Sequence, residues 1–270
     1  MSRTSHNLSL PVGGAIVASL VAIALFAPLF VTRDPLAIDL NNVLAPPGWS
    51  HPFGCDELGR DVLVRIVWGV RLSLLVSTIV VAVSVAIGTL AGGFAALASG
   101  PVDELVMRTI DVLLAFPGIL LALALAAILG PGLFDLVIAL CAIGWTGYAR
   151  LVRGEILSLK ERDYVVAARA LGSSTGRILW RHLMPALMGP LIVRASFGIA
   201  GIIVAEAALS FLGLGAKPPT PTLGNMLEEG RAFLLVAPNL TLAPGAIIGL
   251  SVLGFNLLGD GLAKAFGEVR

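Results

Sequence analysis

The sequence predicts an all-α integral membrane protein with about six transmembrane helices. Hydrophobic residues make up 57% of its 270 residues and charged residues only 13%, whereas a water-soluble domain of this size carries about a quarter charged residues. The mean hydropathy of +0.95 is also too high for a soluble core. Long runs without charge are a further indication, because each can cross a bilayer core of about 30 Å.

Four predicted helices follow directly from these runs, in which His6 is the only ionisable residue. The runs are residues 4–32, 72–102, 112–134 and 232–259. Two more helices, near residues 133–152 and 190–213, tolerate a charge within the span or at its ends. The first run is too long for the apolar stretch of a cleaved signal peptide, so we expect it to be a helix.

The chain therefore divides into three expected parts. Residues 1–32 form a tail and the first helix, residues 33–70 an extracytoplasmic segment, and residues 71–270 a five-helix core. Most of the 18 lysines and arginines fall in segments that are inside when the N-terminus is inside, as the positive-inside rule requires. The exception is the segment from Arg33 to Arg71. We expect both termini and a loop of residues 153–189 to be cytoplasmic.

Glycines within the predicted helices, such as Gly88 and Gly92 or Gly245 and Gly249, have two explanations. Small residues four apart allow two helix backbones to approach closely. Alternatively, glycine is simply more common in membrane helices than in soluble ones. The sequence leaves both explanations open.

The stretch DYVVAARALGSSTGRILWRHLMP (residues 163–185) is a compact basic island in this apolar chain. Asp163 is a suitable N-cap for a short helix, and Gly172 can adopt the left-handed conformation that ends it. One of the two serines that follow can cap a second helix, which would run to the residue before Pro185. The sequence predicts two short helices joined by a sharp corner.

Arg177 and Arg181 form a basic edge on the second of these helices. A basic corner that projects into the cytosol can adhere to anionic lipid headgroups or dock to another protein. The residues alone favour neither explanation.

Motifs for catalysis, nucleotides and metals are not supported. GSSTG, residues 172–176, fits the G-x-S-x-G pattern of hydrolases, but that pattern needs a preceding strand and a triad partner. The phosphate-binding pattern G-x-x-x-x-G-K-[ST] does not occur, so a nucleotide that powers this protein must bind another subunit. Cys55 and Cys141 are expected at different depths, and together with three scattered histidines they make no metal-ligand spacing.

The island resembles the cytoplasmic loop of type I ABC importer permeases, whose pattern is E-A-A, three residues, G, nine residues, then I-x-L-P. Four residues stand at the matching spacings: Ala167, Ala168, Gly172 and Pro185. The departures are Val166 for the glutamate, His182 for the isoleucine and Met184 for the leucine.

Further segments resemble the C-type permease subunit of dipeptide, oligopeptide and nickel importers. They are HPFGCDELGRDVLVRIVWGVRLSL, MRTIDVLLAFPGILLAL, YARLVRGEILSLKERDYVVAARALG, EAALSFLGLGAKPPTPTLG and FNLLGDGL. They occur in the family's order and cover nearly the whole chain. Cys55 stands where threonine is usual, and Leu223 where tryptophan is common.

This resemblance implies a transport subunit of a prokaryotic cytoplasmic membrane and not an enzyme. The implied partners are a homologous permease in a heterodimer, two ABC ATPase subunits, an extracytoplasmic substrate-binding protein and the lipid bilayer, with no nucleic acid. No cofactor is expected on this chain, since ATP and Mg would bind the ATPases. The island would be the coupling element, with Gly172 setting its angle and four candidate polar contacts: Asp163, Arg169, Arg177 and Arg181.

Two charges fall inside a predicted span, where ionisable residues are functional candidates. Glu206 is nearer the outer end and could face the partner permease, the transport path or lipid headgroups. Arg194 is expected to extend toward the cytosolic interface. Short peptides are the expected solute, and a nickel chelate is the alternative. A channel or another membrane protein that is not an ABC subunit is the competing class, and it would need no docking corner.

Overall fold

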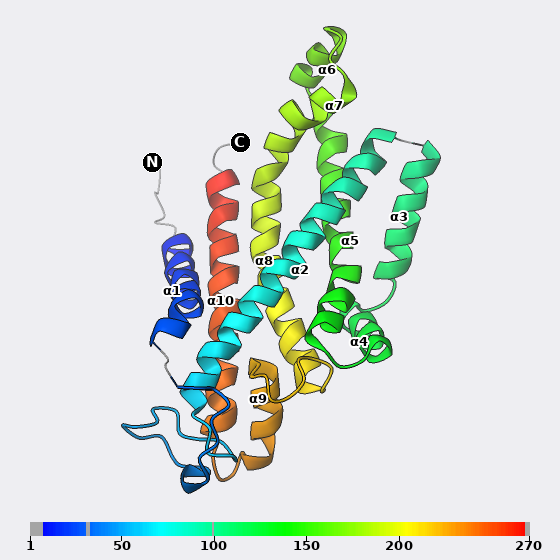
Figure 1. Ribbon diagram of the computed structural model, residues 1–270. Coiled ribbons are helices and arrows are strands. Elements are labelled where there is room, and N and C mark those ends of the chain that lie inside the picture. Colours follow the sequence, from blue (N-terminus) through cyan, green and yellow to red (C-terminus); the bar gives the residue numbers. More distant parts are fainter. Residues whose placement is uncertain (1–7, 31–32, 99, 268–270) are drawn as a thin grey trace.

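A computed structural model describes residues 8–30, 33–98 and 100–267 of the chain as a bundle of helices (Figure 1). The long helices are α1 (Ser9–Phe30), α2 (Val62–Ala98), α5 (Leu133–Leu159), α8 (Met184–Phe211) and α10 (Asn239–Gly267). The shorter helices are α3 (Gly100–Leu114), α4 (Gly118–Leu129), α6 (Asp163–Ala170), α7 (Thr175–Ile178) and α9 (Leu223–Gly230). Within the described residues, the only β-type pairing is an isolated bridge between Cys55 and Asp61.

Five helical segments of the described chain are long and apolar enough to cross a membrane, and the number is six if the bent pair of α3 and α4 counts as one span. This confirms the predicted all-α membrane fold with about six spans. The expected straight helix over residues 112–134 is wrong, however, because α3 and α4 meet at 86°. Pro117 stands at the break, where it lacks a backbone N–H and disfavours a helical conformation at Phe116.

Helix α2 begins at Val62, well before the uncharged run that predicted its start at Leu72. The Asp61 carboxylate accepts hydrogen bonds from the backbone N–H groups of Leu63 and Val64, at 2.9 and 3.3 Å. Such a cap satisfies N–H groups that have no partner in the first turn. The expected boundary is therefore wrong, because capping and not hydropathy determines where this helix starts.

Helix α2 runs obliquely across α8 and α5 and packs against both, whereas α1 packs against α10 (Figure 1). Gly88 and Gly92 face the α5 backbone so closely that a Cβ atom at either position would collide with Tyr148 or Ala149. The close-approach explanation is confirmed for this pair. Gly249 has open space around it and Gly245 makes only ordinary contact with Leu227, so that pair needs no such explanation.

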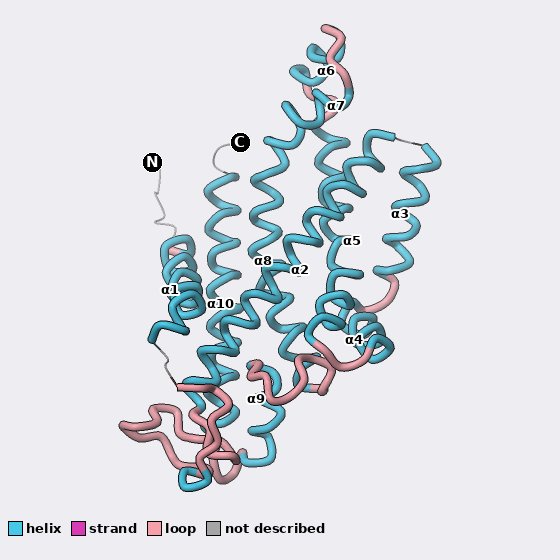
Figure 2. Tube along the Cα trace, in the orientation of Figure 1, coloured by secondary structure: helices cyan, strands magenta, loops and turns pink. Residues whose placement is uncertain are grey.

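The two ends of the bundle differ (Figure 2). Helices α6 and α7 project beyond the other helices at one end, where α1 starts and α10 finishes. The segment before α2 and helix α9 cover the opposite end. Met1 and Arg270, on which the expected orientation of the termini depends, lie outside the described residues.

Candidate functional site

The first half of the projecting corner is α6. Its N-cap is Arg162, and Asp163 is the first helical residue, so the prediction that Asp163 caps the helix is wrong by one position. A carboxylate in the first turn still complements the helix dipole.

Gly172 ends this helix in the left-handed conformation, with φ of 81°. The Gly172 N–H donates to the carbonyl of Arg169, and the Ser173 N–H donates to the carbonyl of Ala168, both at 3.0 Å. This pair of bonds is the Schellman motif, which satisfies the last carbonyls of a helix and requires a residue that tolerates positive φ. The predicted conformation of Gly172 is confirmed.

The second half of the corner starts at Ser174, whose hydroxyl accepts a hydrogen bond from the Arg177 N–H at 3.4 Å. The helix then continues through a π-helical turn, Leu179–Leu183, directly into α8. The expected end before Pro185 is therefore wrong. A proline ring would meet the carbonyl four residues earlier in a regular helix. The wider π turn just before Pro185 relieves this conflict, because it shifts the hydrogen bonds from i→i−4 to i→i−5.

The corner is attached to the bundle through a buried apolar cluster. Val165 of α6, Ile178 of α7 and Leu183 of the π turn pack with Val152 and Ile156 of α5. Because α7, the π turn and α8 are also continuous, a displacement of the corner is transmitted to α8. The corner thus packs against the adjoining half of α5 and continues directly into α8.

Seven of the eight residues predicted to belong to the corner lie on its surface. Seven are exposed and Ala168 is half-buried; the exposed ones are Asp163, Ala167, Arg169, Gly172, Arg177, Arg181 and Pro185. Two large apolar side chains on the same surface were not predicted from the sequence: Leu171, which is 87% exposed, and Trp180, which is 67% exposed. Exposed apolar groups of this size on a projecting element favour docking to a protein.

Glu206 of α8 lies inside this chain and is only 1% exposed. Its carboxyl group accepts hydrogen bonds from the hydroxyls of Ser73 on α2, at 2.8 Å, and of Ser210 one turn along α8, at 2.9 Å. A buried carboxyl group needs such partners. The contact ties α8 to α2. Sequence spacing could not reveal it, because Ser73 is far from Glu206 in the chain.

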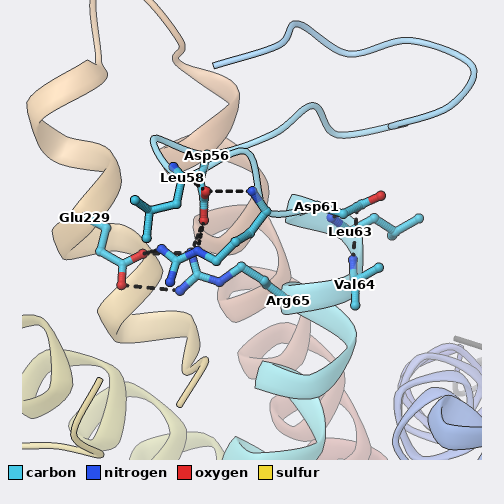
Figure 3. Close-up of polar contacts among 8 residues, drawn as sticks. Asp56, Leu58, Asp61, Leu63, Val64, Arg65 and Glu229 are labelled. Carbon is cyan, nitrogen blue, oxygen red and sulfur yellow. Dashed lines mark hydrogen bonds and ion pairs between the residues drawn. The ribbon is translucent and has the colours of Figure 1, made fainter. Parts of the chain in front are cut away.

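A buried ion cluster lies at the opposite end of the bundle (Figure 3). Arg65 of α2 contacts Asp56 of the preceding segment and Glu229 of α9, the latter at 2.7 Å. Arg60 bridges the same two carboxylates, at 2.7 Å from Asp56 and 3.2 Å from Glu229. We call these four residues the outer clamp, because they join the segment before α2, α2 itself and α9 at the end of the bundle away from the corner. No sequence motif identified it.

Metal binding has no support in residues 8–30, 33–98 and 100–267, where no three His, Cys, Asp or Glu residues are placed to hold a metal ion.

Comparison with known proteins identifies the family. Residues 84–268 match the family described as "Binding-protein-dependent transport system inner membrane component". The chain belongs to this family. It is 43% identical over 254 residues to the dipeptide transport system permease protein DppC of Alkalihalophilus pseudofirmus, covering 94% of this chain and 84% of that protein. It is 42% identical over 253 residues to the glutathione transport system permease protein GsiD of Pectobacterium atrosepticum, covering 93% and 84%.

A solved structure supports the fold. The methionine ABC transporter MetNI, in inward-facing conformations, contains a chain that superposes with a TM-score of 0.63 at 17% identity, over 75% of this chain and 96% of that one. The chain is accordingly a multi-pass membrane permease of a binding-protein-dependent ABC importer, with ATPase and substrate-binding partners. It is a transport subunit and not a catalytic one.

Proposed function

We propose that this permease imports di- and oligopeptides as one half of a heterodimer with a homologous permease. The observation that carries the proposal is the similarity over more than nine tenths of the chain to permeases named for dipeptides and for glutathione, which are both short peptides. Two ABC ATPase subunits and an extracytoplasmic binding protein complete the assembly. ATP and Mg bind the ATPases, and this chain holds no cofactor.

The corner of residues 163–185 is the proposed ATPase contact. Leu171 and Trp180 supply exposed apolar area, and the corner also carries four exposed charged residues: Asp163, Arg169, Arg177 and Arg181. When the ATPases close, they would displace the corner, and α8 would carry the motion into the membrane. The permease pair would then rock between inward and outward access through two alternative packings of its helices.

The corner and both chain ends are cytoplasmic in this proposal, and residues 33–70 and 214–238 are extracytoplasmic. Single cysteines in place of Gly176 and Thr220, both exposed, should therefore react with a membrane-impermeant maleimide from opposite sides of the membrane. Native Cys55 gives little background, because burial raises the pKa of its thiol and lowers the thiolate fraction. Reaction of both introduced cysteines from the same side would contradict the topology.

Growth and uptake in a strain that lacks this gene test the substrate. We expect that strain to lose growth on short peptides as the sole source of a required amino acid, and the restored gene to recover it. Intact peptide use combined with lost nickel accumulation would instead establish the metal-chelate alternative.

A further inference from the structure

The side chain of Arg194 on α8 is exposed on this chain and lies against α5. The Nη2 atom of its guanidinium lies 3.0 Å from the position that a Cβ atom would occupy at Gly147. Gly147 is near the middle of α5, which spans Leu133–Leu159. The guanidinium therefore lies beside the middle of that helix, and the absence of a side chain at Gly147 makes room for it.

A cavity of about 270 Å³ lies between α4, α5 and α8. Gly201 and Ala205 of α8 line this cavity, and they stand at the i+7 and i+11 positions relative to Arg194. Residues at these spacings share one face of a helix. On α5, Gly144 lines the cavity one turn from Gly147. Arg194 and the cavity therefore lie on the same face of α8. We call this face, together with the adjoining side of α5, the groove; its cavity is lined by apolar residues.

The same side of α5 carries a second charged feature. Arg150, one turn inward from Gly147, forms an ion pair with Asp111 of α3 at 2.6 Å, and both side chains are more than half exposed on this chain. Exposed charges within a membrane-spanning helix are unfavourable against lipid and face water or protein. Two separate charged features on this side thus indicate that the groove faces an aqueous path or another subunit.

The charges in the groove do not balance. Asp111 and Arg150 neutralise each other, whereas no aspartate or glutamate of the described residues forms an ion pair with Arg194. Among the described residues, the groove therefore presents one guanidinium without an acidic partner beside an apolar cavity. An arginine in this state is suited to bidentate binding of a carboxylate.

From this arrangement we propose that Arg194 binds the C-terminal carboxylate of a peptide in transit, while the adjoining cavity accommodates its side chains. This inference rests on the proposed peptide transport. Peptides that differ in every side chain still share a free C-terminal carboxylate. A single guanidinium can bind this shared group, and an apolar groove beside it does not select for particular side chains. Arg194 is then a residue that positions the peptide within the transport path.

The test uses the complete complex with its second permease, ATPases and binding protein, reconstituted in proteoliposomes. Uptake of a labelled dipeptide and of its C-terminal amide is measured for the wild type and for Arg194→Met, Arg194→Lys and Gly147→Ala. The methionine keeps the apolar stem without the charge, and the alanine methyl displaces the guanidinium without removing it. Arg108→Met, on the exposed surface of α3, is the matched control.

We expect Arg194→Met to reduce dipeptide uptake at least tenfold, with normal assembly and little change in the amide's rate. Arg194→Lys should retain a substantial part of the wild-type dipeptide uptake rate, and Gly147→Ala should show an intermediate rate. Arg108→Met should show the full wild-type rate. Three results would overturn the proposal: unchanged uptake by Arg194→Met, an equal loss for dipeptide and amide, or loss of the second permease from the purified complex, which would make Arg194 a subunit contact. Failure of peptide import as such would appear differently, as absent uptake by the wild type.

Discussion

A Gly172→Val variant is expected to insert into the membrane normally and to lose most ATP-driven uptake. Gly172 has φ of 81° and closes the Schellman motif between α6 and α7. A β-branched residue in this left-handed conformation costs about 1–2 kcal/mol of local strain, which the short helix α6 can relieve by changing the angle of the corner. Co-purification of the ATPase subunits and peptide uptake measure the effect.

Gly176→Ala is the matched control, because Gly176 lies in the same corner, in helical conformation, with open space around it. This change should leave uptake and ATPase association unaffected. Uptake and ATPase association of Gly172→Asn should lie between those of Gly172→Val and Gly176→Ala, since asparagine tolerates the left-handed region better than valine. Normal ATPase association and normal uptake in Gly172→Val would show that the corner is not the coupling element.

Arg65→Met is expected to produce the largest loss of stability. Arg65 is 2% exposed and contacts both Asp56 and Glu229, so its removal leaves Arg60 alone to compensate two carboxylates. Breaking a buried ion pair by removing one partner costs about 3–5 kcal/mol. The thermal midpoint of the purified permease in detergent should fall by about 6–20 °C.

Two further variants isolate the effect of the outer clamp. Arg65→Met combined with Glu229→Met leaves a balanced pair of Asp56 and Arg60, and should recover part of the loss. Arg108→Met breaks an ion pair that is exposed on both sides and should cost less than about 1 kcal/mol. If Arg65→Met lowered the midpoint no more than Arg108→Met, the clamp would have no special role in holding the outer segment.

The sequence predicted the parts of the fold that depend on composition and local conformation. Uncharged runs located the spans, and Gly172 predicted the corner, because positive φ is a property of one residue and its neighbours. The errors arise where a local interaction overrides the pattern used for the prediction. The Asp61 cap extends α2, Pro117 divides a span, and the π turn continues the helix past Pro185.

Features that join distant segments could not be predicted. The bond from Ser73 to Glu206 and the position of Arg194 against Gly147 depend on which helices become neighbours. The outer clamp likewise needs α9 to lie beside the start of α2. An isolated charge in a span identifies a residue of interest, but only the packed structure supplies its partner.

Accumulation of a labelled dipeptide in proteoliposomes tests the central claim most directly. The liposomes hold the permease pair and its ATPases, with ATP inside and the loaded binding protein outside. We predict that the internal dipeptide concentration will exceed the external one, and that this accumulation will require both hydrolysable ATP and the binding protein. Equilibration of the dipeptide across the membrane without ATP would contradict this account and would establish a channel instead.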